Sequence, residues 1–347
     1  MKFRYRLTLL VLFLSSFSVS TSYAKIWRVN NRGVIPADFT SAQAAHDGAN
    51  PGDTIFLEPS PTNYGNLTVS KKLIVIGTGY FLAENLETQW KNNWPAILGS
   101  VTFDVFSDYS QLMGTICGSL QVSAPYITIR RNYINDIIQL SASNIVVLEN
   151  YCDFLGGYGC TTISFLKINS GFHDISINNN IFIFHPRPYT SGAGVGDISG
   201  SVSYAGGFLN NIIMGYLSWN CAASSSLNLE NFIVQNNIIS TCTFYQNNNY
   251  YTNNICNNTE FGNQNGNQEN VDLNTVFLYT GSTDGQYQLK TGSPAIGAGF
   301  GGVDCGAFGG LNPYILSGIP PIPAIYDFNI GSANNQYNVQ LKVKAHN

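Results

Sequence analysis

The sequence is poor in charged residues. Only 10% of its 347 residues are Asp, Glu, Lys or Arg, whereas a soluble domain usually carries about 25%. No Lys or Arg occurs between Arg187 and Lys290. The chain therefore has no basic patch for nucleic acid, and no nucleic-acid partner is expected. Hydrophobic residues make up 44% of the chain, which excludes a classical disordered protein.

Metal-binding patterns are also missing. The chain has seven Cys and four His, but no Cys-x-x-Cys pair, no Cys/His cluster, no Asp-Asp pair and no Asp-x-Asp run. Zinc sites need clustered Cys and His, and calcium sites need clustered carboxylates. The sequence predicts no metal site and no cofactor. An odd number of cysteines leaves at least one thiol free.

A long apolar run occurs only at the N-terminus. Lys2, Arg4 and Arg6 precede an apolar run from Leu7 to Phe17, and Ser22-Tyr23-Ala24 follows. This pattern predicts a signal peptide over residues 1–24, cleaved after Ala24, and a secreted or cell-surface protein. The run is too short to span a bilayer, so no transmembrane segment is expected in the mature chain. The segment holds three of the 16 cations, which leaves 13 against 20 acids, a net charge of −7.

Asparagine is the residue that the chain has in excess, with 41 Asn against 27 Leu. Asn tolerates the left-handed backbone and hydrogen-bonds within its own turn. Together with many Ile, Val, Tyr and Phe, this composition predicts short strands joined by tight polar bends.

An internal repeat organises the middle of the chain. The pattern is apolar-x-apolar-x-x-Asn-[Tyr/Ile]-apolar, and it occurs as ITIRRNYI (127–134), IVVLENYC (145–152), ISINNNIF (175–182), GGFLNNII (206–213), FIVQNNII (232–239) and NYYTNNIC (249–256). Its Asn column is Asn132, Asn150, Asn180, Asn211, Asn237 and Asn254. The column two residues later is Ile134, Cys152, Phe182, Ile213, Ile239 and Cys256.

Three alternating residues before each Asn indicate a strand with one buried face. We expect the Asn to bend the chain, because the left-handed backbone costs it little, and the later apolar column to point inside. Stacked windings would bury this face and align the amides along the stack. The sequence thus predicts an all-β parallel β-helix. In it Cys152 and Cys256 fill the core, and a bridge between Cys152 and Cys160 is an alternative.

The N-terminal end differs from the repeat. A short amphipathic helix is expected after Asp38, capped by Thr40 or Ser41 and ended by the turn at 51–53. Such a helix would cover the open end of the stack. The first strand is expected at Thr54–Leu57 and another strand at 71–77.

The C-terminal end changes character after Pro313. Pro320, Pro321 and Pro323 favour an extended linker. Residues 325–330 and 337–343 are predicted to form a strand pair, which either caps the stack or makes a small β tail. The predicted organisation is a signal peptide (1–24), a parallel β-helix domain with its N-terminal cap (25–316), and a linker with the strand pair (317–347).

Three segments carry a family resemblance. The opening helix with PGDTI (51–55), the segment LTVSKKLIVIGTG (67–79) and the late motif SPAIGAGFGGVDCGAFGG (293–310) resemble secreted right-handed parallel β-helix proteins of the pectate-lyase-like superfamily. With the Asn repeats, the resemblance covers roughly residues 26–312. It implies a right-handed winding, and the glycines of the late motif fit a turn of close approach. It is specific for a fold and not for an activity.

Catalytic patterns are sparse. A polysaccharide lyase needs a base and a cation or calcium, and a glycoside hydrolase needs two carboxylates about 5 Å or 6.5–9.5 Å apart. The galacturonase-type motifs Gly-His-Gly and Arg-Ile-Lys are absent. The remaining catalytic candidates are Asp153, Asp174 and His185. Arg131 is expected to be a solvated charge at the rim. Glu149 occupies the same position in the next repeat, so the two residues are also predicted to form an ion pair.

The binding candidates lie in and beside an insertion at residues 186–204. Loops on a rigid scaffold often carry function, and tyrosines stack on sugars. We therefore select Arg187, Tyr189, Asp197 and Tyr204. The expected function is that of a secreted, non-catalytic β-helix that binds glycans or acts at the cell surface, with a polysaccharide or cell-surface glycan as its partner. The alternatives are a carbohydrate-active enzyme (polysaccharide lyase or glycoside hydrolase) with a non-standard site, and a structural spacer.

Overall fold

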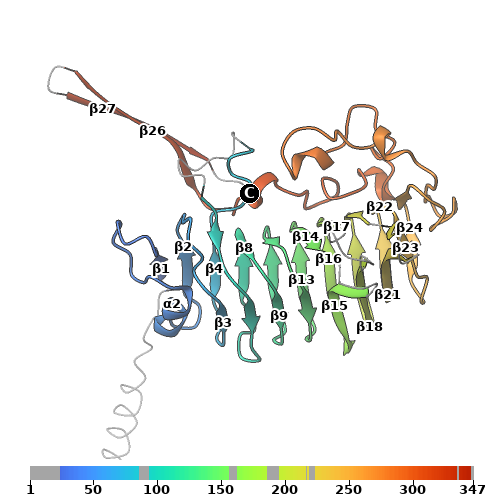
Figure 1. The fold of residues 1–347 in the computed structure, drawn as a ribbon, viewed down its shortest axis with the longest axis horizontal. Coiled ribbons are helices and arrows are strands. Elements are labelled where there is room, and N and C mark those ends of the chain that lie inside the picture. The colour runs from blue at the N-terminus through green and yellow to red at the C-terminus, as the bar shows by residue number, and fades with distance from the viewer. Residues whose placement is uncertain are drawn as a thin grey trace, which may run out of the picture.

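The structure is a computed structural model that describes residues 24–85, 94–155, 162–185, 195–215, 217–218, 223–333 and 336–344. Within these residues the molecule is all-β, with long parallel sheets and one α-helix (Figure 1). The predicted all-β class is confirmed, and the arrangement is compatible with a parallel β-helix. The described part of the chain contains no helix with the length and apolarity needed to cross a membrane.

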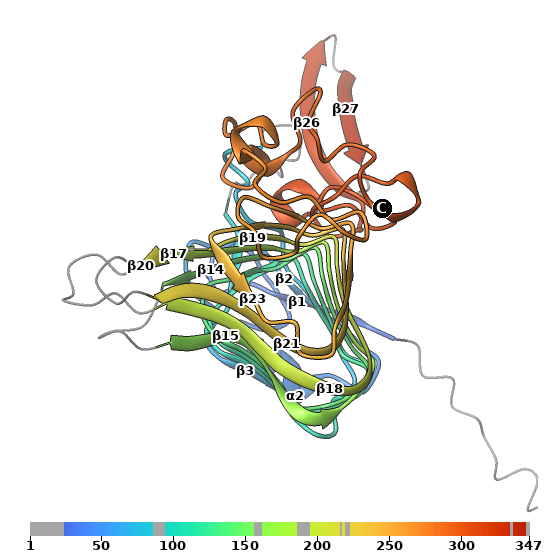
Figure 2. The same cartoon turned by 90° about the vertical axis from the view of Figure 1, so that its right-hand side faces the viewer.

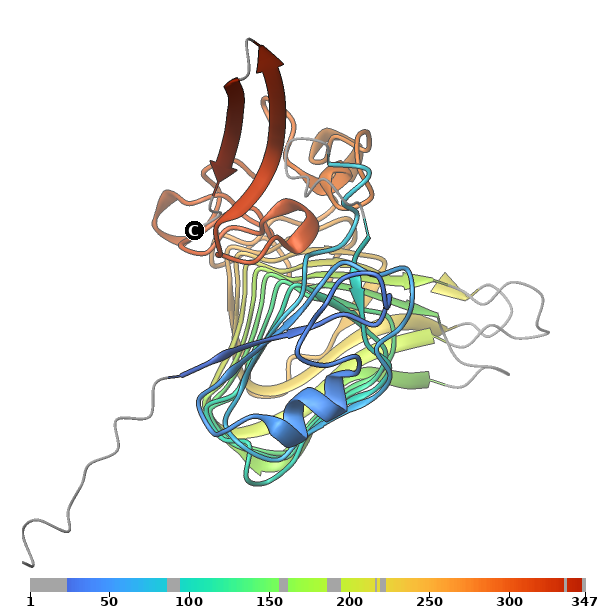
Figure 3. The same cartoon turned by 90° about the vertical axis from the view of Figure 1, so that its left-hand side faces the viewer.

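Successive strands enter three parallel stacks in rotation. From β10 (Thr128–Arg130) the chain passes through β11 (Tyr133–Ile134) and β12 (Ile138–Leu140), and it then pairs with β10 again as β13 (Ile145–Leu148). Seen end on, the windings overlie one another on three sides (Figure 3). We call these sides face 1, face 2 and face 3, in the order in which the chain passes from β10 to β12.

The three faces account for most of the strands. Face 1 contains β1 (Ile26–Val29), β2 (Thr54–Leu57), β4 (Ile74–Ile76), β7 (Gln111–Met113), β10, β13, β16 (Ile175–Asn178), the later parts of β18 (Val195–Leu209) and β21 (Ala223–Gln235), and β24 (Tyr250–Thr252). Face 2 contains β5 (Ala96–Ile97), β8 (Thr115–Cys117), β11, β14 (Tyr151–Leu155), β17 (Ile181–His185), β19 (Ile212–Met214), β22 (Ile238–Ser240) and β25 (Ile255–Cys256). Face 3 contains β3 (Leu67–Val69), β6 (Val101–Phe103), β9 (Leu120–Val122), β12, β15 (Thr162–Phe172), the earlier parts of β18 and β21, and β23 (Cys242–Phe244). The short β20 (Leu217–Ser218) pairs antiparallel with β21.

The core runs along the inside of the three faces. On face 1 the register places Val75, Leu112, Ile129, Val147 and Ile177 on successive strands, and all five are completely buried. Each winding buries its inner apolar side chains only because the next winding covers them, which is why a repeat of this kind must stack. The inner face is therefore a continuous apolar column.

The six repeat asparagines stack at the corner between face 1 and face 2. Asn180 shows the pattern: its Oδ1 accepts from the backbone N–H of Asn150 at 2.9 Å and from Asn150 Nδ2 at 3.0 Å, and its own Nδ2 donates to the carbonyl of Val147 at 2.9 Å. The same bonds join every neighbouring pair from Asn132 to Asn254. All six side chains are completely buried. Asn267 extends this amide ladder by one step.

The left-handed backbone lies one residue earlier than the sequence pattern predicts. At this corner, positive φ is found at the residues before the ladder asparagines, namely Arg131, Glu149, Asn179, Asn210, Asn236 and Asn253. The prediction that the column asparagines themselves make the bend is therefore wrong. The reason is geometric: a ladder side chain must point into the corner to bond both neighbours, so the sharp turn falls on the preceding, outward-pointing residue.

A helix covers the N-terminal end of the stack, as expected. Helix α2 (Ala42–Gly48) is capped at its N-terminus by Ser41, whose side chain accepts a hydrogen bond from the N–H of Ala44 at 3.2 Å. Ala42 and Ala45 are completely buried against the first windings. The expected first strand at Thr54–Leu57 is in fact the second, because β1 precedes the helix and pairs with β2 in parallel.

Residues 257–320, the return segment, run back along the outside of face 2 (Figures 1 and 2). The outward-pointing residues that precede the ladder asparagines hold the return segment in place. Asn179 Nδ2 donates to the carbonyls of Ala307 and Gly309 at 2.9 and 2.7 Å. The glycine-rich late motif makes this approach possible. Gly306 has φ +85°, and a Cβ there would lie 2.8 Å from Ile238 Cδ1. The segment contains η2 (Leu273–Thr275), η3 (Gly285–Tyr287), η4 (Phe300–Gly302) and η5 (Leu316–Gly318).

The chain ends in the predicted strand pair. Strands β26 (Ala324–Ala333) and β27 (Gln336–Lys344) form an antiparallel hairpin. Of the two alternatives left open by the sequence, the structure has the small tail, because the hairpin points away from the windings and covers neither end (Figures 1 and 3).

Cysteines fill the core. Cys152 and Cys256 are completely buried free thiols in the inward column, as predicted. Burial raises the pKa of both thiols, so they stay protonated and inert. Cys160, the alternative partner of Cys152, lies outside the described residues.

We predict that Asn180→Ala lowers the free energy of unfolding by roughly 3–5 kcal/mol. The substitution leaves several completely buried polar groups of two neighbouring windings without hydrogen-bond partners. The measurement is urea unfolding of both proteins. The control is Asn247→Ala, which removes an exposed amide whose side-chain bond within the described residues is to Asn228, and it should change stability by less than about 0.5 kcal/mol. Equal losses for the two variants would contradict the structural role of the ladder.

Candidate functional site: a polar pocket on the return segment

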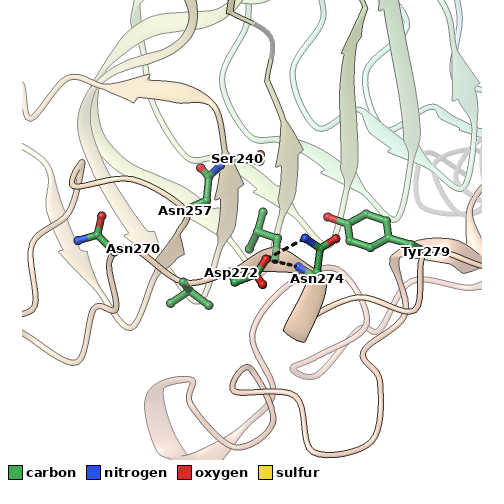
Figure 4. Close-up of a pocket in the computed structure, with 8 residues that line it drawn as sticks. Ser240, Asn257, Asn270, Asp272, Asn274 and Tyr279 are labelled. Atoms are coloured by element: carbon green, nitrogen blue, oxygen red, sulfur yellow. Dashed lines mark hydrogen bonds between the residues drawn. The ribbon is translucent and has the colours of Figure 1, made fainter.

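A pocket of about 400 Å³ lies where the return segment meets the end of face 2. Its walls come from the last residue of β22, from the chain just after β25, and from the segment around η2. The lining residues are Ser240, Asn257, Asn270, Val271, Asp272, Leu273, Asn274 and Tyr279. Figure 4 shows Asp272 and Asn274 between Asn257 and Tyr279.

Local capping fixes the middle of the pocket. Asp272 is the N-cap of η2, and its Oδ1 accepts from the N–H and the Nδ2 of Asn274 at 3.0 and 2.9 Å. The carbonyl of Asp272 also accepts from the hydroxyl of Thr275 at 2.7 Å. These bonds hold the carboxylate of Asp272 and the amide of Asn274 against each other in the pocket lining.

Other polar groups of the pocket keep unused hydrogen-bonding capacity. Asn257 Oδ1 accepts from the N–H of Thr241 at 2.9 Å, which fixes the side chain, but within the described residues its Nδ2 donates to no acceptor. The side-chain amide of Asn270 makes no hydrogen bond within the same part of the chain. Burial and the nearby Asp272 raise the pKa of Tyr279, so its hydroxyl remains a neutral donor. The pocket therefore offers donors and acceptors beside the apolar side chains of Val271 and Leu273.

Sequence reasoning did not find this pocket. Its residues follow the last repeat and come from three separate segments, so no single motif contains them. The run NNTEFGNQNGNQENVDLN (257–274) is unusually dense in amides, and this density was the available signal.

The structure brings two of the three catalytic candidates together. Asp153 in β14 and His185 at the end of β17 form an ion pair, with 3.2 Å between Oδ1 and Nε2. Tyr133 donates its hydroxyl to Asp153 Oδ2 at 3.3 Å. The hydrogen bond that His185 donates to the carboxylate of Asp153 raises the pKa of His185 and outweighs the effect of its partial burial. This group faces outward on face 2.

Asp174, the third catalytic candidate, lies elsewhere. It precedes β16 at the corner between face 3 and face 1, where its Oδ2 lies 2.7 Å from His173 Nδ1. The ring of His173 stacks on Tyr204 at 4.5 Å between centroids. Asp174 therefore belongs with Tyr204, one of the binding candidates, and does not join the pair on face 2.

The binding candidates are not assembled into one site by the described residues. Asp197 is mostly buried on face 3, where burial raises its pKa and its Oδ1 has no hydrogen-bond partner within the described part of the chain. Tyr204 is exposed at the corner described above. Arg187 and Tyr189 lie outside the described residues.

The expectation of a solvated rim charge at Arg131 is wrong. Its side chain is 1% exposed and pairs with Glu149, which is equally buried and also accepts from Arg130 at 2.9 Å. Arg131 donates as well to the carbonyl of Ile319 at 2.9 Å. The return segment covers this position, which the repeat pattern did not reveal. The predicted ion pair itself is confirmed.

Arg28 lies beside two carboxylates, because its backbone N–H donates to Asp38 Oδ2 at 2.9 Å and its Nε donates to Glu58 Oε1 at 2.6 Å. Arg130, Arg131 and Glu149 form a buried structural cluster. Among the residues described, no group of three or more His, Cys, Asp or Glu side chains is placed to hold a metal ion.

We predict that His185 titrates above its ordinary pKa of about 6.5, and that Asp153→Asn lowers its pKa toward that value. Because the folded-state pKa is the higher one, the pair stabilises the protein fully below about pH 6.5 and loses this effect as the pH rises through the folded pKa. NMR titration of the His185 ring protons measures this pKa in the wild-type protein and in the Asp153→Asn variant. Asp174→Asn is the control and should leave His185 unchanged; an equal shift in both variants would refute the assignment.

Comparisons with known protein families, with curated proteins and with solved structures find no match to this chain.

Proposed function

We propose that the protein is a secreted, non-catalytic, right-handed parallel β-helix of the pectate-lyase-like kind, and that it binds neutral glycans in the polar pocket. The observation that carries this proposal is the pocket lining. The amide nitrogen of Asn257 and the side-chain amide of Asn270, which make no hydrogen bond within the described residues, line a pocket of about 400 Å³ together with the carboxylate of Asp272 and the ring of Tyr279.

This lining suits the chemistry of a sugar. A pyranose offers neighbouring hydroxyls, each a donor and an acceptor, and an apolar C–H face. Amides and carboxylates pair with such hydroxyls, whereas the ring of Tyr279 and the side chains of Val271 and Leu273 accept the C–H face. The volume lies within the usual range of small-molecule sites.

The charge of the pocket favours neutral over acidic sugars. Among the described residues that line it, Asp272 alone is charged, and Lys290 lies beside them with its ammonium bonded to the carbonyl of Asn274. The sequence carries no Lys or Arg between Arg187 and Lys290. A uronate or sulfate would therefore meet a like charge in the lining, whereas the neighbouring ammonium of Lys290 is already bonded to the carbonyl of Asn274.

Handedness and location rest on separate arguments. Crossovers between parallel strands of one sheet are right-handed in about 98% of cases, which supports a right-handed winding. The charged, apolar and small-residue order of residues 1–24 supports export.

One observation favours the second candidate, a carbohydrate-active enzyme. Asp153 and His185 form a partly exposed acid–base pair beside the hydroxyl of Tyr133. A hydrolase would also need a second carboxylate across the scissile bond, and Asp174 does not supply it from its separate corner. Binding therefore stands first.

We predict that Tyr279→Ala and Asn257→Ala each weaken binding of a neutral glycan about tenfold or more, because each removes about 1.4 kcal/mol or more of contact or hydrogen bonding. The ligand is first identified on a glycan array and its affinity is then measured by calorimetry. Tyr250→Ala, which changes an exposed tyrosine outside the pocket, is the matched control.

The outcomes separate the alternatives. A flat array together with no rise in melting temperature for any sugar would favour a structural spacer and refute the proposal. Binding that survives both pocket substitutions would place the site elsewhere.

We expect no release of reducing ends or unsaturated products when the wild-type protein is incubated with a panel of neutral and acidic polysaccharides. Cleavage that Asp153→Asn and His185→Gln abolish, with Asp174→Asn unaffected as the control, would establish the enzyme instead.

A further inference from the structure

The terminal hairpin presents one apolar face to solvent. Ile330 of β26 lies directly opposite Val339 of β27, and residues in register point to the same side of an antiparallel pair. Side chains alternate along a strand, so Tyr337, Leu341 and Val343 share the side of Val339. The exposed fractions are 59% for Ile330, 79% for Tyr337, 58% for Val339, 51% for Leu341 and 51% for Val343.

The opposite side of the hairpin is polar. Asn338, Gln340 and Lys342 of β27 alternate with the apolar residues and are exposed. The hairpin is therefore amphipathic, with the pattern of a strand pair that packs on a second layer. Within the described chain it has no such layer, because it points away from the windings (Figures 2 and 3).

A hairpin of two strands is marginally stable in water and needs a third strand or a packed layer. From these observations we propose that the missing layer is the hairpin of a second copy of this chain, so that two molecules associate with their apolar hairpin faces packed about a twofold axis.

The exposed area agrees with a dimer. Each of the five apolar side chains exposes on the order of 100 Å², so two facing hairpins bury roughly 1,000 Å² from these residues alone. This reaches the lower limit of a specific interface. A twofold axis lets one patch serve both partners, since each copy supplies the same residues.

Charge and shape also favour a second copy. The described side chains of the apolar face carry no charge, so two copies meet without like-charge repulsion. The chain as a whole has a formal net charge of −4, and the projecting hairpin lets contact form while the two sets of windings stay apart.

The test is sedimentation velocity of the full chain, without its N-terminal segment if this is removed on export, over a wide range of concentration. We expect a reversible dimer. Leu341→Lys places two charges in the interface of each dimer and should weaken association on the order of 100-fold. Gln340→Lys, one residue away on the polar side, is the matched control and should leave association unchanged. Circular dichroism of each variant reports whether the windings remain folded.

Crosslinking gives an independent readout. Val339→Cys should form a disulfide-linked dimer under mild oxidation, whereas Gln340→Cys should not. A monomer at every concentration, equal effects of both lysine substitutions, or equal crosslinking of both cysteine variants would overturn the proposal. Binding of a monomeric chain to phospholipid vesicles through Leu341 would also overturn it, because the apolar face would then meet lipid.

Discussion

The buried amide ladder is the interaction on which the rest of the structure depends. An amide buried without a partner costs about 1–3 kcal/mol, so each ladder asparagine is tolerated only while the winding on either side supplies its bonds. Asn150 must find Asn132 on one side and Asn180 on the other. A slip of one residue in one direction would place an apolar side chain such as Ile181 at this corner and leave the neighbouring amides unpaired. A slip in the other direction would turn the inner apolar side chains of the winding outward. The ladder therefore fixes the register, although 13 to 31 residues separate its neighbouring members in sequence.

The same corner also positions the return segment. Because the residue before each ladder asparagine has a left-handed backbone, its side chain points outward, over face 2. Asn179 and Arg131 use this position to hold the carbonyls of Ala307 and Ile319. The return segment is thereby fixed along the outside of the sheet, and the polar pocket forms where it begins. Core register, return segment and candidate site are thus consequences of one repeated turn.

The sequence predicts those parts of the molecule that depend on local patterns. Alternation identified the strands around Ile129 and Ile177, and the helix cap at Ser41 was among the two expected positions. Contacts between distant segments could not be predicted in this way. Arg131 looked solvated because nothing in its repeat indicates Ile319, 188 residues later. The pairing of Asp153 with His185 depends on the register of β14 and β17, whereas the separate position of Asp174 depends on which corner of the winding it occupies. The pocket combines Ser240, Asn257 and Tyr279 from three segments, so no motif could reveal it.

The most direct test of the account is native-state hydrogen exchange at the backbone amides that donate to ladder side chains, such as those of Asn132, Asn150 and Asn180. If the ladder holds the register, these amides exchange only through global unfolding, with the same opening free energy as the central strands of face 1. Rapid exchange at the ladder amides while the neighbouring strand amides stay protected would contradict the account, because the corners would then open without loss of the windings.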